Sequence, residues 1–183
     1  MDLSYEIIRS SRTTLAIQIT PEGRVLVRCP RRMRTEDVQR FVREKTPWIL
    51  RRLDCVRSQP RLPVLTDEQL RELTVRAKAD LTARVAHWAP QVGVCCGRIT
   101  IRHQHSLWGS CSAQGNLNFN CLLMLTPDRV RDYVVVHELC HRIEMNHSPA
   151  FWAQVERVLP DYRQQRGWLS AHGAALIGRL PNF

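Results

Sequence analysis

The sequence has no long uninterrupted run of hydrophobic residues. No stretch approaches the roughly 18 to 20 apolar residues that a membrane-spanning helix needs. The first residues, MDLSYEIIRSSR, also lack the basic, then apolar, then small-residue order of a secretory signal. We therefore predict a cytoplasmic protein without a membrane partner.

Cysteine pairs with the C-x-x-C spacing are also absent. The seven cysteines are odd in number and are scattered along the chain. This pattern argues against a disulfide framework and against a zinc site built from thiolates. We expect reduced and mostly buried thiols.

Acidic residues are scarce relative to basic ones. The chain has 27 Lys and Arg against 17 Asp and Glu, a formal net charge of +10, and residues 1–64 contribute 14 Lys and Arg against 7 Asp and Glu. Such a bias favours anionic partners, nucleic acid first, although an ordinary solvated surface produces the same count. Nucleic acid is therefore a predicted partner of the basic N-terminal region.

The hydrophobic pattern changes period near residue 30 and again after a proline-containing stretch, SQPRLPV. Before the first change it predicts a three-stranded antiparallel meander, and after it two short helices that start at Thr35 and Thr46. We take residues 1–62 as an N-terminal unit and residues 63–183 as the core unit, with one continuous domain as the alternative.

The second unit begins with a predicted amphipathic helix from Thr66 to about Trp88. Two strands follow, RITIRHQ and NLNFNC, with a loop between them. In NLNFNC the side chains alternate, so that one face is apolar and the other carries Asn116, Asn118 and Asn120. The asparagine face fits either a solvated sheet surface or a strand that lines a cleft.

A further helix is predicted to start at Thr126, with Thr126 as its cap and Pro127 in the first turn, and to end near Met145. It contains the sequence HELCH. His137 and His141 are one turn apart on one face, so both imidazoles can bind one zinc ion at about 2.0 to 2.1 Å from each nitrogen. Glu138 stands beside them, where it can hydrogen-bond water held by the metal and act as the general base.

Chance is a poor explanation of this H-E-x-x-H pattern. With 7 His and 9 Glu in 183 residues, about 0.01 occurrences are expected. The motif also lies in an apolar run, where unpaired histidines and a carboxylate are costly to bury. A metal ion would compensate for that cost.

A catalytic zinc ion usually has three protein ligands and one position for water. His147 is the first choice for the third ligand, because it comes just before a predicted helix that Ser148 caps and Pro149 begins. Glu144, Glu156 and His172 are the alternatives.

Four segments, LWGSCS, NLNFN, YVVVHELCH and NHSPAFW, together make the chain resemble the YgjP-like zinc metallopeptidase family, a bacterial group related to the SprT and WLM zincins. The resemblance extends over the whole chain. It implies an α+β fold with a zincin-like core, in which a mixed sheet lies beside the HExxH helix. It also implies that His137, His141 and His147 bind the metal and that Glu138 is catalytic.

By the same resemblance, residues 116–120 would be the edge strand that pairs with an extended substrate, while Trp108 and Cys111 would shape the neighbouring loop. Related SprT-type proteases act on proteins crosslinked to DNA, which is compatible with the basic N-terminal region.

We therefore predict a hydrolase that depends on one zinc ion, most simply a metallopeptidase acting on a peptide or protein. Tyr162, Tyr133, Arg142 and His172 are the candidates for stabilising the oxyanion, and Tyr162 is also counted among the substrate-binding residues. The alternatives are a zinc-dependent phosphoanhydride hydrolase acting on nucleotides, and a nucleic-acid-binding module with a structural zinc. The sequence does not specify an oligomeric state.

Overall fold

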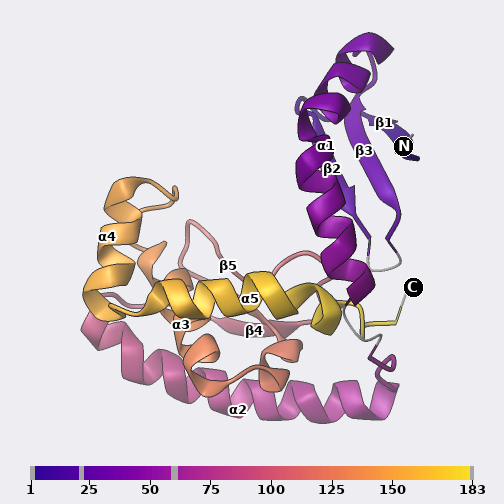
Figure 1. Ribbon diagram of the computed structural model, residues 1–183. Coiled ribbons are helices and arrows are strands. Elements are labelled where there is room, and N and C mark those ends of the chain that lie inside the picture. Colours follow the sequence, from indigo (N-terminus) through magenta and orange to yellow (C-terminus); the bar gives the residue numbers. More distant parts are fainter. Residues whose placement is uncertain (1–2, 21–22, 59–61, 182–183) are drawn as a thin grey trace. The chain divides into compact units, whose positions relative to one another are not determined.

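The chain forms two compact units, Met1–Arg61 and Leu62–Phe183, each with its own hydrophobic core (Figure 1). The computed structural model describes residues 3–20, 23–58 and 62–181. The first unit combines one helix and the second unit several helices with a small mixed sheet, so the predicted α+β class is confirmed.

The N-terminal sheet has β3 (Val25–Pro30) at its centre, with β1 (Glu6–Ser10) and β2 (Ala16–Ile19) on either side. Strand β1 is parallel to β3 and β2 is antiparallel to it. The prediction of an antiparallel meander is therefore wrong, because β1 does not pair with β2. Alternating side chains determine which face of a strand is buried, but they do not determine which strand is its neighbour.

One helix, α1 (Thr35–Ser58), follows this sheet, so the prediction of two short helices is also wrong. Pro47 lies inside α1 and removes one backbone hydrogen bond, a change that costs about 3 kcal/mol in a helix interior. The helix nevertheless continues, because its apolar residues before and after Pro47 share one buried face. These residues are Val38, Val42, Ile49 and Leu53.

The sheet of the second unit has the order β4-β6-β5. Strand β4 (Ile99–Arg102) is parallel to β6 (Leu117–Asn120), and β5 (Gly109–Cys111) is antiparallel to β6. The sheet is therefore mixed, as predicted. The sequence pattern missed β5, because three small or polar residues give no alternation.

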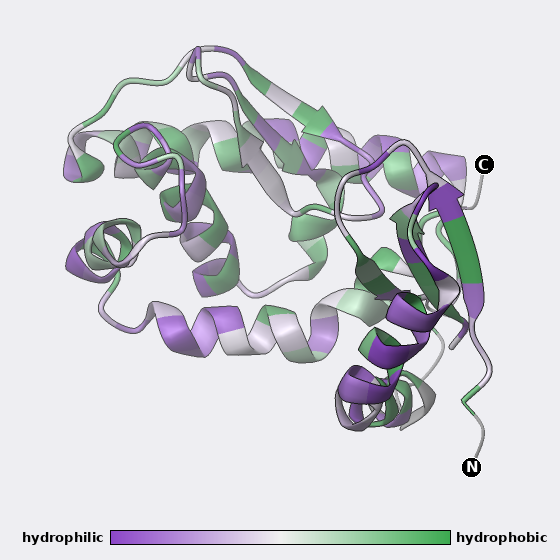
Figure 2. Ribbon diagram, turned by 90° about the horizontal axis from the view of Figure 1, so that it is seen from above, coloured by the Kyte–Doolittle hydropathy of each residue, from purple (hydrophilic) through white to green (hydrophobic). Residues whose placement is uncertain are grey.

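Five helical segments complete this unit. They are α2 (Asp67–Val92), the 3-10 helix η1 (Cys121–Leu125), α3 (Asp128–Cys140), α4 (Pro149–Val158) and α5 (Tyr162–Ile177). Helix α3 packs against both α2 and α5, and Figure 1 shows it between them. Hydrophobic and hydrophilic residues alternate along the helices, as expected for amphipathic helices that cover a core (Figure 2).

Two of the predicted helix ends agree with the structure, while the two ends of α3 do not. Thr66 caps α2 through a capping box, and Ser148 caps α4. In contrast, the Thr126 hydroxyl donates to the Leu123 carbonyl and does not cap α3. Helix α3 also ends at Cys140 and not near Met145, because the next N–H groups bond carbonyls three residues back and tighten the last turn.

None of the described helices is both long enough and apolar enough to cross a membrane.

Candidate metal centre

Three histidine side chains meet at the C-terminal end of α3. His137 is in its last turn, His141 is its C-cap, and His147 comes just before α4. One nitrogen of each ring belongs to a group whose members all lie within 4.8 Å of one another. The Nε2 atoms of His137 and His147 are 2.9 Å apart.

The early end of α3 makes this convergence feasible. Because the helix stops at Cys140, the chain can reverse within a few residues and bring His147 back to His137. The His141 Nδ1–H donates to the Glu144 carbonyl at 3.1 Å, since a carbonyl can only accept. This bond leaves the Nε2 lone pair of His141 free for a metal and orients its ring.

Aromatic side chains of α4 hold the three rings in place. The Phe151 ring is stacked on His141, with centroids 4.5 Å apart, and makes edge contacts with His137 and His147 at 4.9 Å. Trp152 is stacked on His147 at 5.7 Å. Since Ser148 and Pro149 determine where α4 begins, they also determine where these two aromatic rings lie.

The three rings suit a zinc ion chemically. Burial, followed by the neighbouring His141 and His147, lowers the pKa of His137 to about 3, and burial also lowers the pKa of His141. Both imidazoles are therefore neutral at pH 7, which is the form that binds metal. Tetrahedral zinc with Zn–N bonds of 2.0 to 2.1 Å needs nitrogens about 3.3 Å apart, close to the 2.9 Å between the Nε2 atoms of His137 and His147.

Burial decreases from His141 through His137 to His147, which is exposed. A ligand set with one open side can admit water or substrate, as catalytic zinc sites do.

None of the alternative third ligands belongs to this group of described residues. The Glu144 carboxylate accepts from the Asn146 N–H, and Glu156 is ion-paired with Arg163 at 2.7 Å. The His172 ring lies against Trp168 on α5. Of the candidates weighed from the sequence, His147 is the one that the structure places beside His137 and His141.

Glu138 is almost completely buried and lies against the backbone of β5. A β-carbon added to Gly109 would be only 2.6 Å from Glu138 Oε1 and 2.7 Å from its Cγ. Burial raises the pKa of Glu138 to about 8 in the metal-free protein. Gly109 was not singled out from the sequence, where a glycine in LWGSC gave no sign that its missing side chain makes room for Glu138.

The three asparagines predicted to bind substrate all bond within the protein. Asn116 Oδ1 accepts from the Arg98 N–H, and Asn118 Nδ2 donates to Ser110 Oγ. The Asn120 side chain is fully buried and bonds the carbonyls of residues 104 and 107. These amides stabilise the sheet and its loops.

The expectation that residues 116–120 form the edge strand is wrong. Strand β6 is central, and β5 is the edge strand that contacts α3. The sequence analysis did not predict β5, which lies between β4 and β6 in the chain. It therefore could not predict that β4 and β6 pair in parallel and leave β6 at the centre of the sheet.

The remaining candidates for substrate binding and oxyanion stabilisation lie at different distances from the histidines. Trp108 is half-buried against α5, where a β-carbon at Gly173 would come within 3.2 Å of its indole nitrogen. Tyr162 is buried and stacks on Trp152 at 5.3 Å, and Tyr133 lies 5.8 Å from the His137 ring. Arg142 is occupied by the carbonyls of Cys95 and Ala113.

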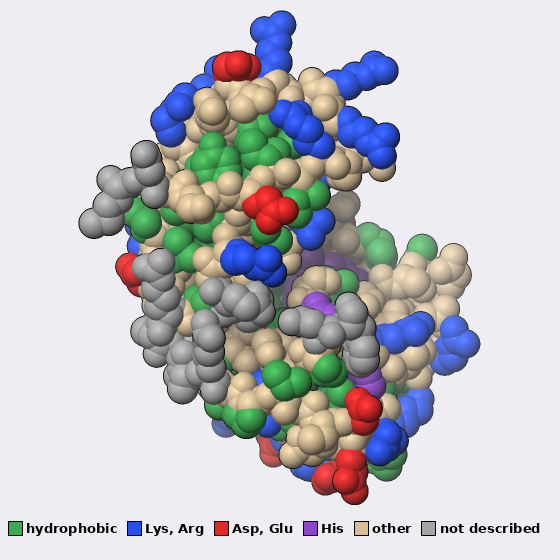
Figure 3. Space-filling model, turned by 90° about the vertical axis from the view of Figure 1, so that its right-hand side faces the viewer, with side chains coloured by type: hydrophobic (Ala, Val, Ile, Leu, Met, Phe, Trp, Pro, Cys, Tyr) green, Lys and Arg blue, Asp and Glu red, His purple; other side chains and the backbone are tan. Residues whose placement is uncertain are grey.

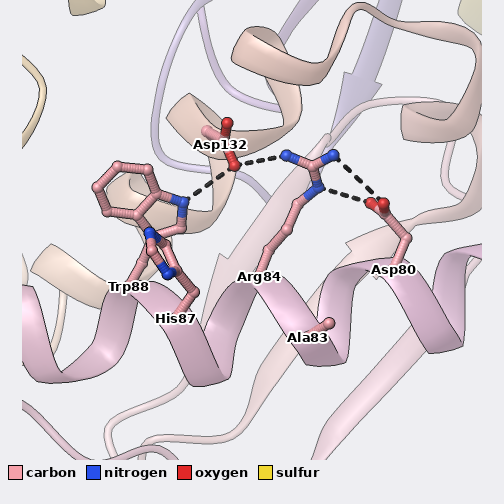
Figure 4. Close-up of a pocket in the computed structure, with 6 residues that line it drawn as sticks. All are labelled: Asp80, Ala83, Arg84, His87, Trp88 and Asp132. Atoms are coloured by element: carbon pink, nitrogen blue, oxygen red, sulfur yellow. Dashed lines mark hydrogen bonds and ion pairs between the residues drawn. The ribbon is translucent and has the colours of Figure 1, made fainter.

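An ion network on another face of α3 joins this helix to α2. Arg84 bonds Asp80 at 2.7 Å and Asp132 at 2.6 Å, and the Trp88 indole N–H donates to the same Asp132 oxygen (Figure 4). Together with His87 and Ala83 these residues line a surface depression of about 350 Å³. Asp132 precedes His137 by five residues, so the network fixes the position of the helix that carries the histidines.

Comparison with known proteins supports a family assignment. The sequence matches the family described as "YgjP-like, metallopeptidase domain" over residues 13–72 and 65–172, well over half of the chain. A search of the curated proteins found no match. One solved structure, the metallopeptidase zymogen of Pyrococcus abyssi abylysin, shares 20% identity and covers 49% of this chain and 92% of its own, with a TM-score of 0.45.

Proposed function

The chain belongs to the YgjP-like metallopeptidase family, and from this premise we propose that it is a peptidase with one zinc ion held by His137, His141 and His147. Glu138 is the general base in this proposal. A metallopeptidase takes a peptide or protein as its substrate, which sets this proposal ahead of a phosphoanhydride hydrolase.

The observation that carries the proposal is the arrangement of four side chains at the end of α3. Three imidazoles present nitrogens within 4.8 Å of one another, and the residue after His137 is a buried carboxyl group. A bound zinc ion would supply Lewis acidity, which polarises a substrate carbonyl and lowers the pKa of a water molecule.

Glu138 would move the proton. Its carboxylate form accepts a proton from the attacking water and then returns it to the leaving amine. The close approach of Gly109 keeps the carboxyl group against β5, so the base lies beside the strand at the edge of the sheet. The environment of Glu138 excludes most water, which strengthens its interactions with reacting groups.

The edge strand β5 is suited to hold an extended peptide. The backbone groups of Trp108 and Ser112 bond β6, and antiparallel pairing alternates, so the N–H and C=O groups of Gly109 and Cys111 point away from β6. A substrate strand could pair with these groups and pass directly beside Glu138. This role replaces the one expected for residues 116–120.

The experiment is a comparison of the zinc-loaded parent with the variant Glu138→Gln. The parent should bind one zinc ion and cleave peptides from a mixed pool, whereas a nucleotide pool should remain intact. The variant should retain the zinc but lose at least about a thousandfold in turnover, because the amide cannot accept the proton. Glu144→Gln is the matched control, with a carboxylate near the end of the same helix but outside the histidine group.

Zinc content is read by elemental analysis and cleavage by mass spectrometry. Cleavage of nucleotides in place of peptides, or full turnover by Glu138→Gln, would overturn the proposed reaction or the assigned base.

The basic N-terminal unit supports nucleic acid as a further partner. Lys and Arg side chains project from this unit in Figure 3. Among the described residues, the exposed arginines of this unit that have no carboxylate partner include Arg31, Arg32, Arg34, Arg43 and Arg51. Unpaired guanidinium groups can bind phosphates and release counterions.

A further inference from the structure

An arginine that the sequence analysis did not consider lies at the edge of the histidine cluster. Arg166 is an exposed residue of α5, and its guanidinium lies over the Trp152 ring, 4.5 Å from the centroid. Such a cation–π contact holds the charged group in a defined place while leaving its N–H donors available.

Among the described residues, Arg166 has no carboxylate partner and no hydrogen-bond acceptor. Arg163, one turn earlier on the same helix, is different: its guanidinium is 2.7 Å from the Glu156 carboxylate. The two arginines therefore provide an internal comparison between a neutralised cation and one whose charge remains unbalanced.

The Trp152 ring connects Arg166 to the proposed metal ligands. It is stacked on His147 with centroids 5.7 Å apart, and its centroid is 5.8 Å from that of His137.

A permanent cation beside a zinc site raises the energy of the loaded site, since like charges repel. Glu138 is the acidic side chain next to His137 in the chain, and it can balance only part of the combined positive charge. The loaded site therefore attracts an anion. A guanidinium group matches a carboxylate especially well, because its planar fork donates two parallel hydrogen bonds.

We propose that Arg166 binds a carboxylate of the substrate and so makes the site selective for anionic peptides. The inference rests on the proposed peptidase function and specifies its substrate class. The carboxylate has two sources, the C-terminus of a peptide or an acidic side chain close to the cleaved bond, and the test separates them.

The test measures binding to the zinc-loaded Glu138→Gln protein, in which peptides are not consumed. Two pairs of probes are used: N-acetyl-tetraalanine as the free acid and as the amide, and N-acetyl-Ala-Ala-Glu-Ala amide with its Gln counterpart. Dissociation constants are measured by calorimetry or by NMR titration, and each pair differs only in the presence of one carboxylate.

At least one pair should show a preference of about tenfold or more for the acid, the value of a charge-assisted hydrogen bond. Arg166→Gln should abolish that preference, and Arg166→Lys should retain part of it. Arg163→Gln, which removes the same charge one turn away, should leave the preference unchanged. Thermal melting checks that the variants remain folded, as expected for an exposed position.

Equal affinities within both pairs, absence of binding by all four probes, or a preference that survives in Arg166→Gln would overturn the inference. Cleavage by the parent is measured separately on the mixed peptide pool. A parent that cleaves peptides without any carboxylate preference refutes only the role of Arg166. A parent that cleaves nothing, yet binds acids through Arg166, refutes only the proposed reaction.

Discussion

The two units of this protein differ in the kind of side chain that they bury. The core of the N-terminal unit is made of apolar residues from β3 and α1, and Thr20 is its one buried polar residue among those described. The second unit buries Glu138, His141 and Asn120 as well as its apolar core. Burial of polar groups costs free energy unless they are paired, so the second unit carries a cost that the first unit largely avoids.

Charge is distributed in the opposite way. The exposed arginines of the N-terminal unit lie in solvent and cost little, whereas the second unit also contains the paired network around Arg84 and an arginine, Arg166, placed over Trp152 beside the histidines. The comparison teaches that a count of charges points to the first unit, whereas the candidate metal centre lies in the second. Four variants, one of them a triple substitution, test this contrast, beginning with the one of largest expected effect.

Replacement of His147 should remove the metal site. In His147→Ala the remaining two imidazoles cannot complete the ligand set, and zinc affinity should fall by at least about a hundredfold, together with nearly all peptidase activity. Competition with a chelator measures the affinity. His172→Ala is the control, because its ring lies against Trp168 outside the cluster. Unchanged zinc affinity in His147→Ala would assign the third ligand elsewhere.

A methyl group at Gly109 should disturb the base without removing the metal. The added β-carbon would collide with the Glu138 carboxyl group, so Gly109→Ala should lower turnover about a hundredfold while the zinc content stays the same. Gly167→Ala is a matched control, since no atom lies within 4 Å of its added β-carbon. Parent-like turnover in Gly109→Ala would show that catalysis does not depend on the close contact between the Glu138 carboxyl group and Gly109.

A substitution of Asp132 tests whether the ion network around Arg84 stabilises the second unit. Asp132→Ala removes a partner from both Arg84 and the Trp88 indole and should lower the free energy of unfolding by about 1 to 3 kcal/mol. Denaturant unfolding measures this loss. Asp128→Ala, with an exposed carboxylate, should cost less than about 1 kcal/mol. A larger loss of unfolding free energy in Asp128→Ala than in Asp132→Ala would show that Asp128 is the more stabilising carboxylate.

The smallest effect is expected in the N-terminal unit. Binding of a short DNA duplex should weaken severalfold when Arg31, Arg32 and Arg34 are all changed to Gln, and the salt dependence of binding should become shallower by about 2 to 3 in slope. Fluorescence anisotropy at several salt concentrations measures both. Arg71→Gln on α2 serves as the control. Binding that does not depend on salt, or that the triple variant leaves unchanged, would exclude this surface.

Several features could be predicted because they depend on residues close together in the sequence. The spacing of His137 and His141 specifies a shared helix face, with Glu138 beside it, wherever the helix lies. Caps at Thr66 and Ser148 agree with the structure for the same reason, since each involves a side chain and a backbone N–H three residues later.

Features that depend on distant residues could not be predicted in this way. The order of strands in both sheets, the passage of α1 through Pro47 and the early end of α3 all follow from packing against other elements. The same holds for Gly109 and Arg166, whose importance lies in what they contact and not in a motif.

The sequence by itself determined the H-E-x-x-H spacing and the basic character of the first unit, because spacing and composition are local or additive, while the α+β class was implied by the resemblance to a known family. Only the tertiary structure decided that β5 is the edge strand, that Glu138 lies against Gly109 and that an unpaired arginine stands over Trp152. These contacts join residues far apart in the chain, and their free energy is gained only when the whole unit packs.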